Sequence, residues 1–223
     1  MVNTFISAYK QTPLRVVSNL YKGLQQRNGV DTLYMKVKWE QELDITLEEE
    51  DWHTMCTTQH SSTSSKRWRE FGWKNLFRFF ITPQIKHKQL RTQQPCWRLC
   101  GHINVNHSHI FWSCPKIRLY WEEVLDRTIE ILGYEVPRDP QVIFLGLITE
   151  ESVHEEDLYL FKVFSLAGKK AITKNWLARD PPKINDWLAV VGEILSMERM
   201  TALLRARLVA HNTRWRKWTD YPH

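Results

Sequence analysis

The amino-acid sequence predicts an all-α protein, an irregular helical bundle interrupted by one short segment that lacks helical periodicity. Apolar residues recur at intervals of three or four over most of the chain, which is the spacing of an amphipathic helix. Only eight of the 223 residues are Gly, which disfavours a protein made of strands and tight turns. Hydrophobic residues make up 43% of the chain, enough to form a buried core, so we exclude a disordered segment.

The N-terminal helices are predicted from periodicity and capping residues. A moderately amphipathic helix is expected over residues 4–26, where Pro13 starts or interrupts it, and a second over residues 31–42. A third helix is expected to begin at a capping box, in which the Thr46 side chain accepts from first-turn amides and Glu49 reaches back to the chain. The Ser-rich stretch that follows predicts a break before the next helix.

Two predicted helices flank the aperiodic segment. The first covers residues 66–80, and Pro83 is expected to close it. Residues 84–115 have no clear period and contain three of the four Cys. Helical spacing resumes at Pro115 and continues to Gly133, a residue typical of helix C-terminal ends.

Two long helices are predicted in the C-terminal part of the chain. They cover residues 155–178 and 185–210, and Pro181-Pro182 separates them. The short apolar run 142–148 precedes them, and a basic, Trp-rich tail follows. We expect three parts, in chain order: an N-terminal helical lobe over 1–65, a basic helix with a Cys- and His-bearing segment over 66–115, and a C-terminal helical lobe with a basic tail over 116–223.

Positive charge is concentrated in two stretches of the chain. The net formal charge is +6, with 31 Lys and Arg against 25 Asp and Glu. Residues 66–100 carry nine Lys and Arg against Glu70 alone, a net charge of +8. Residues 201–223 carry five against Asp220 alone, a net charge of +4, so the rest of the chain sums to −6. This distribution is typical of a protein that binds a polyanion, although a solvated helix face shows it as well.

The most specific motif is a Cys/His cluster with the spacing C-x3-C-x8-H-x4-C, formed by Cys96, Cys100, His109 and Cys114. Zinc prefers this mixture of thiolate and imidazole ligands. Three Cys and one His complete a tetrahedron and leave no open position, so we predict a structural zinc ion (Zn2+) in a zinc-knuckle-like segment inserted between the helical lobes. Four Cys in the whole chain are too few for a disulfide scaffold, and we expect the fourth, Cys56, to be a core residue.

The His ligand is not unique in the sequence. His102, His107 and His109 all lie between the Cys residues. We prefer His109, because its distance from Cys114 matches the second half of a zinc knuckle, and His107 is the next choice. The alternative is three unrelated Cys that are buried as small hydrophobic residues.

Cations and aromatic rings beside the cluster are candidates for nucleic-acid contacts. Flanking Lys and Arg would hold phosphates, and a ring such as Trp97 would stack an unpaired base, although it could equally pack on the protein. For Trp112 we favour packing on the helix that follows it. The candidate contacts are Arg67, Arg69, Lys74, Arg78, Lys86, Lys88, Arg91, Trp97 and Arg98.

Several motifs together carry a resemblance to a known family. They are Lys38-Trp39-Glu40-Gln41-Glu42-Leu43, the stretch 59–70 with its five Ser and Thr, Trp73-Lys74-Asn75-Leu76, Arg78-Phe79-Phe80-Ile81-Thr82-Pro83, Cys96-Trp97-Arg98-Leu99-Cys100-Gly101, His109-Ile110-Phe111-Trp112-Ser113-Cys114-Pro115, Asp139-Pro140, Leu145-Gly146-Leu147 and Asp186-Trp187. Over roughly residues 30–215 the chain resembles the C-terminal segment of the reverse transcriptase polyprotein of LINE-type (non-LTR) retrotransposons, in the form found in fish and other vertebrates.

The resemblance implies a non-catalytic part of a larger polyprotein. In the family, an endonuclease and a reverse transcriptase precede this segment, whose Cys-rich motif is thought to bind RNA or nucleic acid at the insertion site. Consistently, the sequence has no Asp-Asp pair of the kind that holds two catalytic metal ions, and none of the common hydrolase or nucleotide-binding motifs. We therefore expect no enzyme activity, and a truncated copy of such an element read from Met1.

These inferences define the expected partners. We expect RNA or single-stranded DNA, and the upstream polymerase region of the parent polyprotein, but no membrane and no small-molecule substrate. No signal peptide or membrane-length apolar run is evident, which predicts an intracellular protein of the nucleus or cytoplasm. The alternative function is a structural module that packs on the missing polymerase and has no activity of its own.

Overall fold

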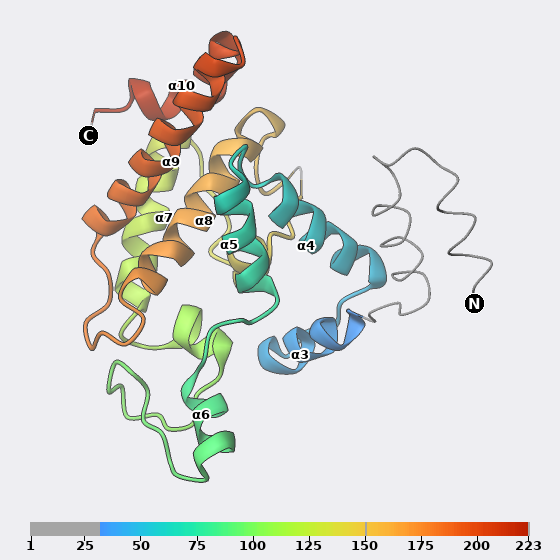
Figure 1. Cartoon of the computed structure of the whole chain (residues 1–223), viewed down its shortest axis with the longest axis vertical. Coiled ribbons are helices and arrows are strands. Elements are labelled where there is room, and N and C mark those ends of the chain that lie inside the picture. The colour runs from blue at the N-terminus through green and yellow to red at the C-terminus, as the bar shows by residue number, and fades with distance from the viewer. Residues whose placement is uncertain (1–31, 150, 223) are drawn as a thin grey trace, which may run out of the picture.

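The structure is a computed structural model that describes residues 32–149 and 151–222, so the predicted helix over residues 4–26 lies outside the described part. The elements, labelled as in Figure 1, are α3 (Leu33–Leu43), α4 (Glu49–Ser61), α5 (Lys66–Leu76), α6 (Pro83–Leu90), the π-helical turn η1 (His109–Ser113), α7 (Arg118–Leu132), the π-helical turn η2 (Gln141–Leu145), the 3-10 turn η3 (Glu155–Asp157), α8 (Leu158–Lys174), α9 (Ile184–Leu204) and α10 (Leu208–Asp220). These residues form helices and no strands, so the all-α prediction is confirmed.

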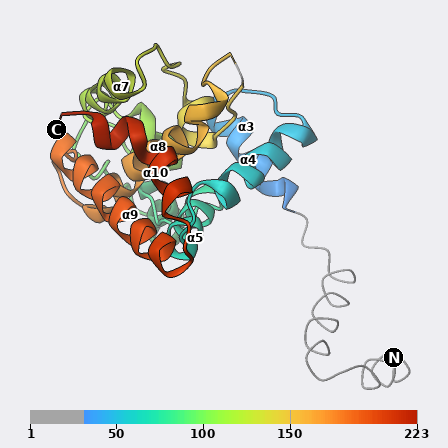
Figure 2. The ribbon, with the colours of Figure 1, turned by 90° about the horizontal axis from the view of Figure 1, so that it is seen from above.

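Helix α8 occupies the middle of the bundle. It packs against α5, α7, α9 and α10, and Figure 2 shows these helices around it. Helices α4 and α5 pack against each other on one side, and α6 with the Cys-bearing segment forms the end of the molecule opposite α10 (Figure 1). The Cys/His segment therefore lies at one end of the molecule along its longest axis.

Buried Trp residues dominate the core. Trp39, Trp68, Trp187 and Trp215 are each no more than 1% exposed, and buried hydrophobic residues from α3 to α10 form one continuous cluster. The indole N–H of Trp39 donates to the Leu76 carbonyl oxygen over 3.0 Å. Such bonds allow a large ring to be buried without an unpaired donor.

Two predicted helix boundaries in the N-terminal half, the start of α4 and the end of α5, are wrong. Helix α4 begins after Glu48, whose backbone N–H donates to the Asp51 carboxylate over 2.8 Å, so the capping box is Glu48–Asp51 and not Thr46–Glu49. The Leu47 amide donates to the Glu40 side chain over 2.9 Å, so Leu47 lies in the connection between α3 and α4.

Pro83 begins a helix instead of ending one. Helix α5 ends at Leu76, and Arg78 then takes a left-handed conformation with φ of 59°, which stops the helix before Phe80. Thr82 caps α6 by accepting from the Ile85 amide over 3.4 Å, and Pro83 occupies the first helical position. Proline suits that position because its missing N–H would be unpaired there anyway.

The later helices follow the prediction more closely. Helix α7 ends at Gly133, whose φ of 88° is the expected left-handed cap. The predicted helix over 185–210 is instead two helices, α9 and α10, because Ala206 takes a left-handed conformation with φ of 51° between them. Helix α10 includes most of the basic tail. Nowhere in residues 32–149 and 151–222 is a helix both long and apolar enough to cross a bilayer.

Candidate metal centre

A tight loop after α6 brings the first two Cys together. The backbone N–H of Leu99 donates to the Cys96 carbonyl oxygen over 2.9 Å, and Leu99 and Gly101 take positive φ values of 51° and 92°. The Cys96 N–H donates to the His102 carbonyl oxygen over 2.9 Å, which ties the loop back on itself. The reversal places the Cys96 and Cys100 side chains on the same side of the loop.

A π-helical turn supplies the other two side chains. The Asn106 side-chain oxygen accepts from the His109 backbone N–H over 2.9 Å and starts the turn. The Cys114 N–H then donates to the His109 carbonyl oxygen over 3.0 Å, a bond that spans five residues. This wide turn directs both side chains towards the loop that carries Cys96 and Cys100. Single π turns inside proteins often occur at functional sites.

The four side chains form a ligand cage. One ligand atom each from Cys96, Cys100, His109 and Cys114 lies within 4.8 Å of the others. The Cys96 and Cys114 sulfurs are 3.9 Å apart, and the Cys100 sulfur is 3.4 Å from the His109 Nε2. Ordinary zinc bond lengths in a tetrahedron give separations of about 3.8 Å between two sulfurs and about 3.5 Å between sulfur and nitrogen. These two separations therefore match those of ligands on one tetrahedral ion.

Electrostatics favour a thiolate in this cage. The pKa of Cys114 is lowered, chiefly because its sulfur accepts a hydrogen bond from the Cys96 thiol, and further by hydrogen bonds from His109 and the Lys116 backbone N–H. The positive charge of Arg98 acts in the same direction. The pKa of Cys96 is raised, first by donating that bond and then by burial. One sulfur is thus prepared as the thiolate that metal binding requires.

His107, the second-choice ligand of the sequence analysis, is not in the cage. It is 1% exposed, and its ring lies against those of Trp39 and Phe111, with centroids 5.6 Å and 4.8 Å away. Neither ring nitrogen has a hydrogen-bond partner, and burial lowers its pKa to about 3. His102 is closer to the cage, because its Nδ1 lies 3.4 Å from the Cys100 sulfur, but its side chain is exposed at the rim.

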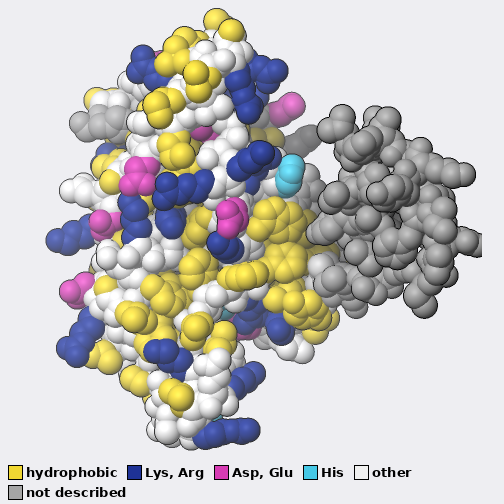
Figure 3. Space-filling model, in the orientation of Figure 1, with side chains coloured by type: hydrophobic (Ala, Val, Ile, Leu, Met, Phe, Trp, Pro, Cys, Tyr) yellow, Lys and Arg dark blue, Asp and Glu magenta, His cyan; other side chains and the backbone are white. Residues whose placement is uncertain are grey.

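The structure separates the basic candidates into exposed and engaged residues. Arg67, Lys74, Lys88 and Arg91 are exposed, although Lys74 pairs with a neighbouring carboxylate in α5 over 2.6 Å. Arg69 and Lys86 are partly exposed. These side chains stay candidates for phosphate contacts, and Figure 3 shows Lys and Arg side chains at the end of the molecule that carries α6.

Two of the residues predicted to contact phosphate, Arg78 and Arg98, have side chains that are engaged within the protein. Arg98 is 5% exposed and donates to the Ile110 carbonyl oxygen over 2.8 Å, which holds the Cys loop against the π turn. Arg78 forms an ion pair with Glu42 of α3, and its side chain is 13% exposed. The Glu42 carboxylate also accepts from the Ser108 amide over 3.0 Å, so the pair joins α3 to the metal segment.

The predicted stacking residue is only partly available. Trp97 is half-buried against the core, and the Lys86 ammonium lies 4.8 Å from the centre of its ring. This cation–π contact fixes the ring beside the cage and keeps a positive charge above it. Trp112 packs against the Trp121 ring at a centroid distance of 5.3 Å, as favoured from the sequence.

A second group of residues of metal-binding types is formed by His154, Glu156 and Asp157. The cation beside this group is the side chain of Lys217. The Lys217 ammonium lies 2.6 Å from the Asp157 carboxylate and 3.6 Å from that of Glu156. The His154 ring stacks on Tyr134 at 3.9 Å. Because the Lys217 ammonium already pairs with both carboxylates, we assign no metal to this group.

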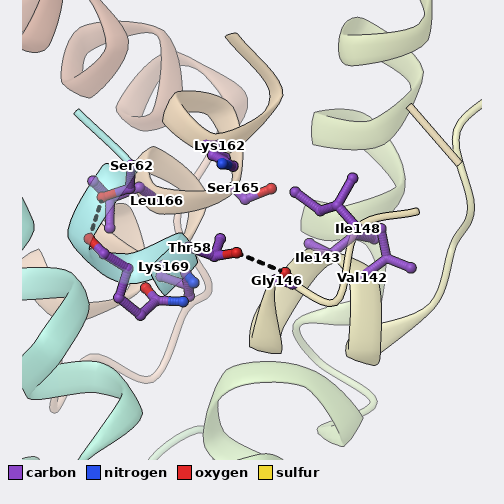
Figure 4. Close-up of a pocket in the computed structure, with 11 residues that line it drawn as sticks. Thr58, Ser62, Val142, Ile143, Gly146, Ile148, Lys162, Ser165, Leu166 and Lys169 are labelled. Atoms are coloured by element: carbon purple, nitrogen blue, oxygen red, sulfur yellow. Dashed lines mark hydrogen bonds between the residues drawn. The ribbon is translucent and has the colours of Figure 1, made fainter. Parts of the chain in front are cut away.

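The burial of the charged residue Lys169 is not evident from the sequence. Lys169 is 3% exposed, donates to the Phe144 carbonyl oxygen over 3.0 Å, and has its pKa lowered to about 7 by burial. It lines the small cavity drawn in Figure 4, whose volume of about 10 Å³ is the size of one water molecule. The sequence does not reveal this burial, because Lys170 follows directly and two adjacent Lys in a helix are normally expected to be exposed to solvent.

A comparison of the chain with models of protein families finds no match. The cage and the residues around it therefore carry the functional interpretation.

Proposed function

We propose that the chain is a non-catalytic nucleic-acid-binding module, the C-terminal portion of a LINE-type retrotransposon reverse transcriptase, that binds RNA or single-stranded DNA. The cage of Cys96, Cys100, His109 and Cys114 carries this proposal, because four protein ligands whose atoms lie within 4.8 Å of one another suit a structural zinc ion. The resemblance of the motifs to that family supplies the biological context.

The proposed zinc ion would organise the basic tip of the molecule. The segment between α6 and α7 contains little regular structure beyond one π turn, so metal bonds would supply folding energy that packing does not. Exposed Lys88 and Arg91 lie at the end of α6, just before the first Cys. The Lys86–Trp97 pair adds a cation beside an aromatic ring, a combination that suits single-stranded nucleic acid.

The test is the salt dependence of binding to labelled single-stranded RNA and DNA. We expect affinity to fall steeply with salt, and the slope to decrease by about one for each of Lys88→Glu and Arg91→Glu, because each phosphate contact releases a counterion. Arg199→Glu, at an exposed position of α9, is the control for the charge change. Failure of the wild type to bind any polynucleotide at low salt ends the proposal.

A second candidate function is docking to a protein. Leu90, Leu99 and Ile103 are 60%, 54% and 51% exposed in the segment that carries the cage. Isolated apolar side chains are ordinary on surfaces, but several on one projecting segment favour a partner such as the polymerase region. A purified chain that self-associates or binds a hydrophobic dye would favour docking, whereas a clean monomer that binds RNA would favour the first proposal.

A further inference from the structure

A second basic feature lies at the opposite end of the molecule from the cage. The end of α9 and the start of α10 enclose a cavity of about 420 Å³, which is large enough for a nucleotide-sized group. Figure 1 places the α9–α10 corner at the top and α6 at the bottom, and Figure 3 shows Lys and Arg side chains at both ends. The lining residues are Ser64, Glu198, Thr201, Ala202, Arg205, Arg207, Ala210, His211, Arg214 and Trp215.

The cavity has an excess of positive charge. Arg205, Arg207 and Arg214 line it, and within the described part of the chain none of them forms an ion pair. Arg214 lies 5.1 Å from the centre of the Tyr159 ring, which restricts its position. Three unpaired guanidinium groups around one cavity are suited to an anion with several oxygen atoms.

The acidic residue of the cavity does not neutralise these groups. Glu198 is 3% exposed, and its carboxylate accepts hydrogen bonds from the Ser64 amide, the Tyr159 hydroxyl and the Trp215 indole over 2.8, 2.5 and 3.0 Å. Three donors, one from the α4–α5 connection and one each from α8 and α10, therefore satisfy this carboxylate inside the protein. Glu198 therefore stabilises the wall of the cavity. The three Arg side chains remain exposed to solvent.

The N-terminus of α10 adds a second source of positive potential. This helix has 13 residues, no side-chain cap and no acidic residue in its first turn, and its N-cap position is Arg207. The first amides of a helix have no partner inside the helix and carry the positive end of its dipole. Ala210 of the first turn lines the cavity, so an anion there would meet these amides.

A buried imidazole ring also lies in the wall of the cavity. His211 lines the cavity, is 8% exposed, and has a ring Nε2 with no hydrogen-bond partner. Its Nδ1 lies 3.2 Å from the Asn212 side-chain oxygen, which fixes the ring. The Nε2 itself is inaccessible to solvent, so the ring forms part of the cavity wall rather than a contact for the ligand.

We propose that the cavity between α9 and α10 binds a phosphate group of the single-stranded nucleic acid, held by Arg205, Arg207, Arg214 and the α10 amides, with the His211 ring in the cavity wall. This inference rests on the proposed function for the identity of the ligand, but its geometry is independent of the metal cage. A strand that reached both sites would run along the length of the molecule. The zinc segment and the α9–α10 corner would then bind separate parts of one polynucleotide.

The experiment compares charge reversals with a matched control. Affinities for labelled single-stranded DNA and RNA are measured over a range of salt for Arg207→Glu, Arg214→Glu and Arg199→Glu, the last being an exposed residue of α9 outside the cavity. We expect at least about a fivefold loss for each cavity variant, and a salt slope smaller by about one. Losses no larger than that of Arg199→Glu would overturn the site.

A probe without nucleotides separates this site from the proposed function. Pyrophosphate is added to the zinc-loaded wild type while the ring signals of His211 are followed by NMR, with Arg207→Glu as the comparison. Shifts that Arg207→Glu abolishes support the site even when no oligonucleotide binds, in which case the proposed function fails alone. Unchanged His211 signals at saturating pyrophosphate, together with normal oligonucleotide binding by the variants, overturn the site and leave the proposed function standing.

Discussion

The backbone N–H of Cys114 donates to the carbonyl oxygen of His109 over 3.0 Å and closes a turn of π-helical width. In an α-helix, residues five positions apart point about 140° away from each other around the axis. The wider π turn reduces this angle and lets both side chains reach one ion. Backbone geometry therefore converts the five-residue spacing into a pair of ligands.

His109→Ala is expected to weaken zinc binding by at least about 100-fold, because it removes one of four ligands. His102→Ala is the matched control, since its exposed ring lies 3.4 Å from the Cys100 sulfur but outside the cage. We expect its affinity to stay within a few-fold of the wild type. Competition with a chromophoric chelator measures both values, and a greater loss for His102→Ala would exchange the roles of the two His.

Arg98→Ala is expected to reduce the free energy of unfolding by about 2 kcal/mol, because the buried Ile110 carbonyl oxygen loses a charged donor. Lys88→Ala, at an exposed position of α6, should change it by no more than about 0.5 kcal/mol. Urea unfolding of the zinc-loaded proteins measures both.

For nucleic-acid binding the order should be reversed, so that Lys88→Ala has the larger effect and Arg98→Ala the smaller. Lys88→Ala is expected to lower the salt slope by about one, whereas folded Arg98→Ala keeps the wild-type slope. A lower slope for Arg98→Ala would show that this side chain contacts phosphate despite its burial.

The metal cage was predictable because the identity and spacing of the residues carry the chemistry. Three Cys and a His at fixed intervals indicate a tetrahedral site whatever the surrounding fold, and Cys96, Cys100, His109 and Cys114 do lie together. The choice of His109 over His107 depended on spacing alone, and the structure agrees because His107 turns into the aromatic core.

Tertiary contacts determine several features that the sequence does not reveal. Charge in the sequence suggested that Arg78 and Arg98 face solvent, but nothing local indicates that Glu42 or the Ile110 carbonyl oxygen is their partner. Likewise, Lys169 is buried because its helix lies in the middle of the bundle, which periodicity alone does not reveal. Helices with strong local end signals, such as Gly133, were placed more accurately.

Lys169 is expected to make stability depend on pH. Burial lowers its pKa from 10.5 to about 7, so between pH 7 and 10.5 the unfolded chain binds a proton that the folded protein does not. The free energy of unfolding should therefore rise with pH from about 7 to 9, by up to about 1.4 kcal/mol per pH unit from this group. In Lys169→Met the rise should be smaller by this amount. Urea unfolding at several pH values tests it, and parallel pH profiles would show that Lys169 is not the cause.

Gly146→Ala is expected to destabilise the protein by about 3 kcal/mol. Gly146 has φ of 81°, and a Cβ added there would lie 2.6 Å from the Thr58 Cγ2. Figure 4 shows Thr58 and Gly146 facing each other, where the Thr58 hydroxyl donates to the Gly146 carbonyl oxygen over 3.0 Å. The substitution therefore combines backbone strain with a steric clash and the loss of this hydrogen bond.

Gly133→Ala separates the strain from the clash. Gly133 has a similar φ of 88°, but a Cβ there would meet no atom within 4 Å. Its cost should be limited to the left-handed backbone, about 1 kcal/mol. Thermal and urea unfolding of both variants measure the difference of about 2 kcal/mol that we assign to the contact between α4 and the turn at Gly146. Equal destabilisation by the two substitutions would mean that the Thr58 side chain moves aside at no cost and that this contact does not fix the position of α4.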